Sequence, residues 1–135
     1  MNYLLDTNTC IYIIKRKPIS VFEKLNALAI GTIAISSITV AELEYGVKNS
    51  AYVEKNRHAL LDFLSPMTIL DFDYPADVEY GNIRKELETK GTPIGSMDLL
   101  IAAHAKSQNL VLVTNNEREF VRIKDLNIQN WVVEE

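Results

Sequence analysis

The sequence predicts an α/β fold in which helices cover both faces of a mostly parallel, twisted central sheet of about five strands. Two observations carry this prediction. The expected strands are short and mainly apolar, without alternation of apolar and polar residues, which is typical of strands buried on both faces. Helical segments separate them, and strand–helix alternation is typical of parallel sheets with right-handed crossovers. The 135 residues suit a single three-layer domain spanning 1–135.

Each element follows from a local pattern bounded by turn residues such as Pro18, Gly31 and the pair Ser65-Pro66. The expected strands cover residues 2–5, 33–36, 67–70, 110–113 and 129–132. The expected helices cover residues 7–15, 19–29, 39–49, 51–64, 75–90, 96–107 and 117–123. The helix over 96–107 is apolar almost all round, which predicts a central position for it.

The composition excludes several classes of protein. The net charge of −4 is unlike that of a protein that binds nucleic acid over its whole surface, although a metal ion can bring positive charge to a local site. The single cysteine, Cys10, excludes an internal disulfide and a cysteine-rich zinc site, and we expect it in the core. We find no membrane-spanning segment and no signal peptide, and therefore expect a cytoplasmic protein.

Acidic residues gather where the predicted strands end. Asp6 directly follows strand 2–5, and Glu42 is expected in the first turn of the helix after strand 33–36. The turn 91–95 leads to Asp98 in the first turn of helix 96–107. Because sites in open α/β sheets form beyond the carboxyl ends of the strands, these three acids are expected at one edge of the sheet.

Each of these positions also has a purely local interpretation. Asp6 is a favoured N-cap residue, and Thr39 to Glu42 matches the capping-box pattern T-x-x-E. Ser96 can cap the helix that carries Asp98, and Asn116 can cap helix 117–123. The local and the functional interpretations are compatible, because a carboxylate at a helix start is kept ionised by the helix dipole.

Carboxylates brought together repel each other, and a divalent cation would offset that repulsion. Oxygen ligands with several retained waters are what Mg²⁺ or Mn²⁺ prefers. A metal held this way, with open coordination positions, suits hydrolysis of phosphodiester bonds. The residues therefore predict a metal-dependent phosphodiesterase.

The motifs that contain these acidic residues are spread in order along the whole chain. They are YLLDTN, SSITVAELEYGV, GTPIGSMDLLIAAHA, LVLVTNNEREF and IQNWV. With them the sequence resembles the PIN-domain ribonucleases, and among these the VapC toxins of bacterial toxin–antitoxin pairs. The resemblance implies a PIN-like fold and a Mg²⁺- or Mn²⁺-dependent endoribonuclease whose substrate can be a tRNA, such as the anticodon region of initiator tRNA.

The resemblance also implies partners. A cognate VapB-type antitoxin would inhibit the protein, with its tail in a groove formed by the helices over 7–15, 19–29 and 39–64. Operator DNA would be bound only through the antitoxin complex, and homodimers are usual in the family. An acidic toxin attracts a basic antitoxin segment, so the net charge agrees with this expectation.

The resemblance assigns roles to individual positions. Asp6 and Asp98 match the primary metal ligands, and Glu42 matches an acid that holds the metal directly or through water. The polar residues expected to orient this cluster are Thr7, Asn8 and Thr114.

One position departs from the family pattern. Many PIN domains carry a fourth acid after the fourth strand, as Thr-x-Asp, and this chain has Asn116 there. Glu119 follows one turn later and is expected to face the same side, where it would compensate. We therefore expect one tightly bound ion.

Other features are less specific. Arg84, Lys85 and Lys90 precede the turn to Asp98 and are candidates for contacts with the RNA backbone. His104 is expected to be a packed structural residue. Two alternatives stay open at this stage: a non-catalytic interaction domain on the same fold and a related DNA-cleaving nuclease. A haloacid-dehalogenase-type phosphatase is excluded, because Asn8 stands where its second aspartate is needed.

Overall fold

The structure is a computed structural model that describes residues 2–133. It contains one five-stranded sheet formed by β1 (Tyr3–Leu5), β2 (Ile33–Ser36), β3 (Thr68–Leu70), β4 (Val111–Val113) and β5 (Ile128–Gln129). The strand order is β3-β2-β1-β4-β5 and every pair is parallel. In the register, Leu4 lies opposite Ala34 on one side and Leu112 on the other. The predicted parallel sheet is confirmed.

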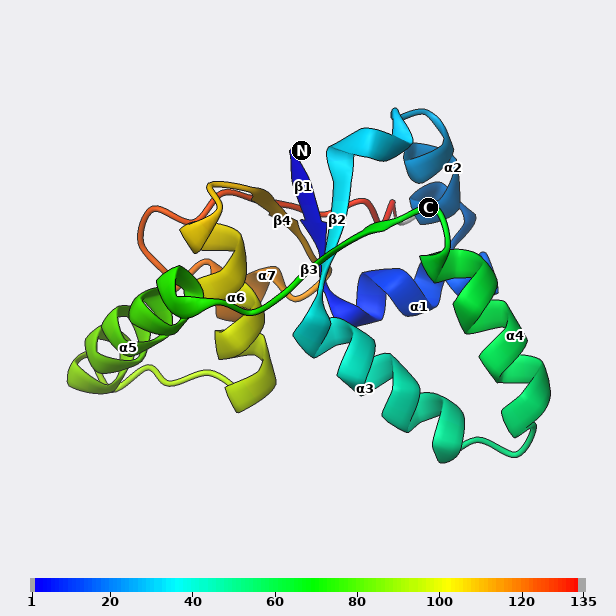
Figure 1. Ribbon diagram of the computed structural model, residues 1–135. Helices are drawn as coiled ribbons and strands as arrows, with labels where there is room; N and C mark the ends of the chain where they lie inside the picture. The colour runs from blue at the N-terminus through cyan, green and yellow to red at the C-terminus, as the bar shows by residue number, and fades with distance from the viewer. Residues whose placement is uncertain (1, 134–135) are drawn as a thin grey trace.

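Seven α-helices connect the strands (Figure 1). They are α1 (Thr7–Lys15), α2 (Ile19–Asn26), α3 (Ser37–Lys48), α4 (Val53–Leu64), α5 (Tyr74–Thr89), α6 (Ser96–Ser107) and α7 (Glu117–Phe120). The expected helix over 19–29 ends at Asn26, because a short 3₁₀ turn, η1 (Ile30–Thr32), leads into β2. The expected helix over 117–123 ends at Phe120, where the backbone tightens to i−3 hydrogen bonds such as Ile123 N–H to the Phe120 carbonyl (3.1 Å).

The strands send alternate side chains into two cores, one on each face of the sheet. Leu4 and Leu112 pack with apolar side chains of α5, α6 and α7. Leu5 and Val113 pack with side chains of α1 to α4, among them the fully buried Cys10. Figure 1 shows the two groups of helices on opposite sides of the strands. The three-layer α/β/α prediction is therefore confirmed, and the period of two along each strand explains it.

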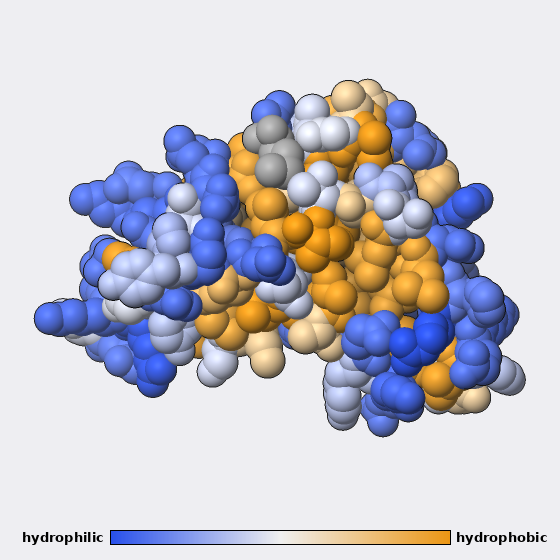
Figure 2. All heavy atoms as spheres, viewed as in Figure 1, coloured by the Kyte–Doolittle hydropathy of each residue, from blue (hydrophilic) through white to orange (hydrophobic). Residues whose placement is uncertain are grey.

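The edge strand β3 is the least covered part of the sheet. Ile69 of β3 and Leu61 of the neighbouring α4 are both exposed, and Figure 2 shows apolar atoms gathered on this face of the molecule. Within residues 2–133, no helix is both long and apolar enough to cross a membrane.

Candidate active site

Asp6 occupies the junction between β1 and α1. Its Oδ1 accepts a hydrogen bond from the Thr9 backbone N–H at 2.8 Å, so it caps α1, and its side chain is only 5% exposed. Its own N–H donates to the carbonyl of Val113, which holds the cap against the end of β4. The cap interpretation is confirmed. It uses Oδ1 and leaves Oδ2 without a hydrogen bond from residues 2–133.

Glu42 does not form the capping box expected from the sequence. The helix begins at Ser37, directly after β2, and Ser36 caps it by accepting from the Ile38 N–H at 3.1 Å. Glu42 therefore lies beyond the first turn, and the capping-box interpretation is wrong. Its Oε1 instead accepts a 2.5 Å hydrogen bond from the hydroxyl of Thr7, which ties α3 to the start of α1. The Thr39 hydroxyl lies 3.4 Å from the same Thr7 oxygen.

Asp98 lies in the first turn of α6, and Ser96 does not cap that helix. The N-cap is Gly95, one residue earlier, and no side chain makes the cap hydrogen bond. Asp98 Oδ2 accepts a long hydrogen bond of 3.4 Å from Nδ2 of Asn116. The same Nδ2 donates to Oε2 of Glu119 at 2.7 Å. Asn116 thus bridges the two acids, and its side chain leaves α7 uncapped.

Glu119 and Thr114 hold this bridge in place. Glu119 Oε1 accepts a hydrogen bond from the Gly95 N–H at 3.3 Å, so the glutamate lies at the start of α6. Its contact with Asn116 agrees with the expectation that the two side chains face the same side of α7. The hydroxyl of the fully buried Thr114 accepts from the Asn116 N–H at 2.9 Å. The turn after β4 is therefore fixed by side chains as well as by the sheet.

The charges of these acids act on one another. Burial, followed by the hydrogen bond and the charge of Glu119 and then by the charges of Asp6 and Glu42, raises the pKa of Asp98 to about 7. The hydrogen bond from Asp98 lowers the pKa of Glu119. None of the ion pairs within residues 2–133 involves any of these four acids. Asp98 thus lies within electrostatic reach of Glu119, Asp6 and Glu42, and we call these four carboxylates the acid cluster.

The acid cluster offers oxygen donors of the kind that Mg²⁺ or Mn²⁺ prefers. As the side chains stand, no three His, Cys, Asp or Glu residues in the described part of the chain are grouped so that they could hold a metal ion. Mg²⁺ is usually bound through one or two carboxylates together with several waters, so it does not require three direct acidic ligands. The donor set therefore fits a hydrated divalent ion held by two of the acids.

The other predicted residues lie outside this cluster. Asn8 is exposed on α1, and its side chain makes no hydrogen bond within residues 2–133. The cations on α5 and at its C-cap are exposed. Arg84 contacts Tyr80 and Glu88. Lys90 pairs with Glu86 at 2.9 Å, and Lys85 is exposed to solvent. Arg84 also lines a cavity of about 100 Å³ next to the start of α6. The structure does not bring these cations into the acid cluster.

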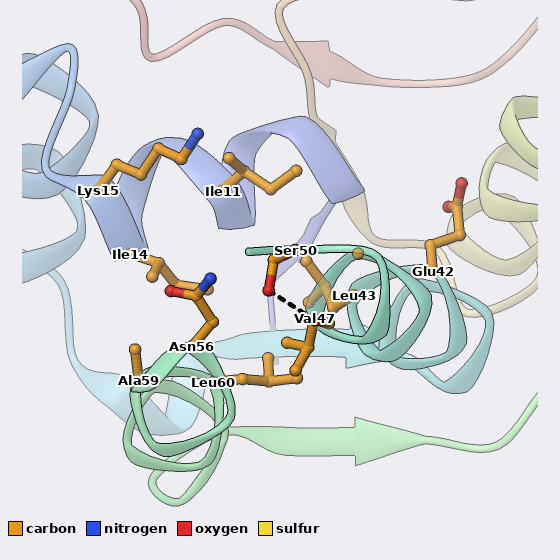
Figure 3. Close-up of a pocket in the computed structure, with 11 residues that line it drawn as sticks. Ile11, Ile14, Lys15, Glu42, Leu43, Val47, Ser50, Asn56, Ala59 and Leu60 are labelled. Atoms are coloured by element: carbon orange, nitrogen blue, oxygen red, sulfur yellow. Dashed lines mark hydrogen bonds between the residues drawn. The ribbon is translucent and has the colours of Figure 1, made fainter. Parts of the chain in front are cut away.

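Two hollows adjoin Glu42. One is an apolar groove of about 280 Å³ between α1, α3 and α4, whose lining includes Ile14, Val47 and Leu60 with Lys15 at its rim. Figure 3 shows Glu42 at one end of this groove, with its carboxylate pointing away from the other lining side chains.

The second hollow, of about 380 Å³, lies between Thr7 and Glu42 on one side and Met97 and Leu100 of α6 on the other. Tyr45 lines it and is 70% exposed. No local sequence pattern predicts this hollow, because its walls come from three helices that are distant in the chain.

The comparisons with known proteins agree with this fold. Residues 3–126 match the PIN-domain family. The chain is 48% identical over 132 residues to ribonuclease VapC2 of Haemophilus influenzae, covering 98% of this chain and 99% of that protein. It is 47% identical over 131 residues to the tRNA(fMet)-specific endonuclease VapC of Salmonella typhimurium, covering 97% and 98%.

A solved structure is also similar to this chain in both fold and sequence. The crystal structure of VapBC2 from Rickettsia felis, bound to a DNA fragment from their promoter, contains a chain with a TM-score of 0.92 to this one. That chain is 49% identical, and the match covers 98% of this chain and 100% of the other. With a parallel five-stranded sheet, an acid cluster at its carboxyl edge and relatives matched over nearly their full length, the chain belongs to the PIN-domain family and, within it, to the VapC ribonucleases.

Proposed function

We propose that this chain is a Mg²⁺- or Mn²⁺-dependent endoribonuclease toxin that cuts tRNA and is held inactive by a VapB-type antitoxin. The observation that carries the proposal is the acid cluster. Burial and Glu119, followed by the charges of Asp6 and Glu42 from distant parts of the chain, raise the pKa of Asp98. Such like-charge repulsion is costly unless a cation relieves it, which is the usual reason to build such a site.

Asp6 and Asp98 would hold the ion directly, and Glu42 would hold it directly or through water. When bound, the ion supplies Lewis acidity at the phosphodiester and positive charge for the developing negative charge on its oxygens. We assign one tightly bound ion, because Asn116 brings no charge to the position of a fourth acid.

The chain's own residues orient these groups. Thr7 donates to Glu42 and fixes the direction of its carboxylate, so that the remaining oxygen can accept a proton from an attacking water. Asn116 donates to both Asp98 and Glu119 and keeps the two acids side by side despite their charges. Thr114 holds the backbone of Asn116 in turn. Asn8, which is exposed near this edge, is assigned a supporting role at the surface.

The substrate class follows from the relatives. The 47% identical protein of Salmonella typhimurium is named a tRNA(fMet)-specific endonuclease, and we extend a tRNA substrate, cut in the anticodon region, to this chain. Arg84, Lys85 and Lys90 would contact the RNA backbone beside the site. A cytoplasmic location follows from such a substrate.

The apolar groove is the proposed antitoxin site. It is walled by α1, α3 and α4, and it ends at Glu42, so a segment lying in it would reach the acid cluster. A basic residue at the end of that segment would pair with the carboxylates and take the place of the ion. The promoter-bound VapBC2 complex of Rickettsia felis supports operator binding through the antitoxin, and a homodimer is proposed for the toxin.

The test compares wild-type protein with Asp6→Asn on matched RNA and DNA strands and on total tRNA, with Mn²⁺ or with EDTA. We expect new tRNA ends with the wild type and Mn²⁺ only, no cleavage by Asp6→Asn, and retained antitoxin binding by both proteins. Cleavage of the DNA strand at an equal rate would favour a DNA nuclease. Growth inhibition that survives Asp6→Asn would favour a non-catalytic interaction domain.

A further inference from the structure

A buried histidine connects the two helices that carry Asp98 and Glu42. His104 lies on α6 with no exposed surface, and its Nδ1 is 2.7 Å from the hydroxyl oxygen of Ser36, also fully buried. Ser36 ends β2 and caps α3, the helix of Glu42. The two residues are 68 positions apart in the chain, so this hydrogen bond belongs to the tertiary structure alone.

The direction of the hydrogen bond can be assigned from its neighbours. Ser36 Oγ already accepts from the Ile38 N–H, so its own hydrogen is available to His104 Nδ1. The imidazole is then neutral with its proton on Nε2, and Nε2 finds no hydrogen-bond partner within residues 2–133. Burial lowers the pKa of His104, which agrees with the neutral form, whereas the charge on Asp73 and the backbone and charge of Asp71 act in the raising direction.

An apolar side chain of similar size would lose the hydrogen bond to Ser36 and the contact of the imidazole with the backbone of Asp71. Packing alone therefore does not explain a histidine here. The ring packs edge-on against Phe72 at 5.3 Å, and the Phe72 N–H donates to Ser37 Oγ at 3.1 Å. Polar contacts thus join α6, the start of α3 and the turn after β3 at one point.

Closer to the acids, α3 and α6 are not packed tightly. The hollow of about 380 Å³ separates Ile38 and Ala41 of α3 from Met97 and Leu100 of α6. Ile38 of α3 packs against the core that contains Leu99 and Ile101 of α6, and the hydrogen bond at Ser36 adds a directional contact between the two helices. A small change in that distance would move the carboxylates of Glu42 and Asp98 relative to each other.

We propose that His104 is a positioning residue for the nuclease reaction, which sets the spacing of Asp98 and Glu42 through its hydrogen bond to Ser36. The proposal rests on the proposed metal-dependent cleavage of RNA. It predicts that the hydrogen bond matters for turnover and for ion binding, and not only for folding.

The test uses two amide variants of His104 with similar chemistry. Asn places its carbonyl oxygen near the position of Nδ1, whereas Gln places its amide near the position of Nε2. His104→Gln is expected to lower kcat by about tenfold or more, with KM changed by less than about twofold, and to weaken the Mn²⁺-induced rise in Tm. His104→Asn is expected to keep kcat within about threefold of the wild type.

A control separates positioning from general destabilisation. Ile101→Val removes one methyl group from the core on the same helix and touches no polar group, so it is expected to lower Tm and leave kcat unchanged. His104→Leu and Ser36→Ala complete the set. Ser36→Ala removes the hydrogen bond to His104 and also the cap of α3, so the double variant should lose no more activity than Ser36→Ala alone.

The inference is overturned if folded His104→Gln turns over RNA and binds Mn²⁺ like the wild type, or if Asn and Gln at this position behave alike. Additive losses in the double variant would also contradict it. Asp6→Asn is measured in the same assays as these variants. If the wild type fails to cut RNA or Asp6→Asn still cuts it, the proposed function fails, and the Mn²⁺-induced Tm shifts still show whether His104 positions the acids.

Discussion

Replacing Asp98 by Asn should make the metal-free protein more stable above pH 7 while abolishing cleavage. The change keeps the size of the side chain and removes one negative charge from the acid cluster. In the native protein that charge is disfavoured by burial and by Glu119, Asp6 and Glu42, which together raise the pKa of Asp98 from 3.8 to about 7. Only the unfolded chain releases the proton near the ordinary pKa.

The direction and size of this stability change follow from the linkage between proton binding and folding. Since the native state binds this proton more tightly than the unfolded state, the stabilising contribution is complete below pH 4 and is lost as the pH rises through about 7. A shift of about three pKa units corresponds to at most about 4 kcal/mol. Asp98 is only half-buried, and screening by solvent reduces this to about 1–2 kcal/mol. We therefore expect Asp98→Asn to gain about 4–8 °C in Tm at pH 8 and nothing at pH 4.

Thermal unfolding in EDTA at several pH values measures this directly. Asp77→Asn is the matched control, because Asp77 also lies in the first turn of a helix, α5, but is exposed. It should lose a few tenths of a kcal/mol through the helix dipole instead of gaining stability. Mn²⁺ should raise the Tm of the wild type and leave that of Asp98→Asn nearly unchanged. If Asp98→Asn is no more stable than the wild type at pH 8, or if the difference does not vary with pH, the acids do not repel one another as argued.

Three further outcomes are expected. Thr7→Val keeps the shape of the side chain but loses the hydrogen bond to Glu42, so single-turnover cleavage should slow by about tenfold while RNA affinity is retained. Asn116→Asp adds a charge beside Asp98 and removes the bridging donor, so it should lower the metal-free Tm and show a second Mn²⁺ site by calorimetric titration. Arg84→Ala breaks only exposed contacts, so it should leave Tm nearly unchanged and raise KM for RNA without changing kcat.

Much of the fold could be read from local patterns. Short apolar strands that alternate with helices predicted the parallel sheet, and the positions of Asp6 and Asp98 at the ends of such elements predicted that acids would gather at its carboxyl edge. Element boundaries were less certain, because helix ends depend on one or two cap residues. The true cap of α3 is Ser36, three residues before the Thr39 that the pattern favoured.

The amino-acid sequence specifies the chemistry available at the site: which carboxylates follow which strands, and that an asparagine stands at position 116. Which of these groups meet depends on the packing of the folded chain. The hydrogen bond from Thr7 to Glu42 spans 35 residues, and the one between Asn116 and Asp98 spans 18. A periodic pattern reports on neighbours within a turn of helix or along a strand, whereas contacts across such separations depend on how the helices pack on the sheet. For that reason the bridge through Asn116 and the buried pair of His104 and Ser36 became visible only in the folded chain.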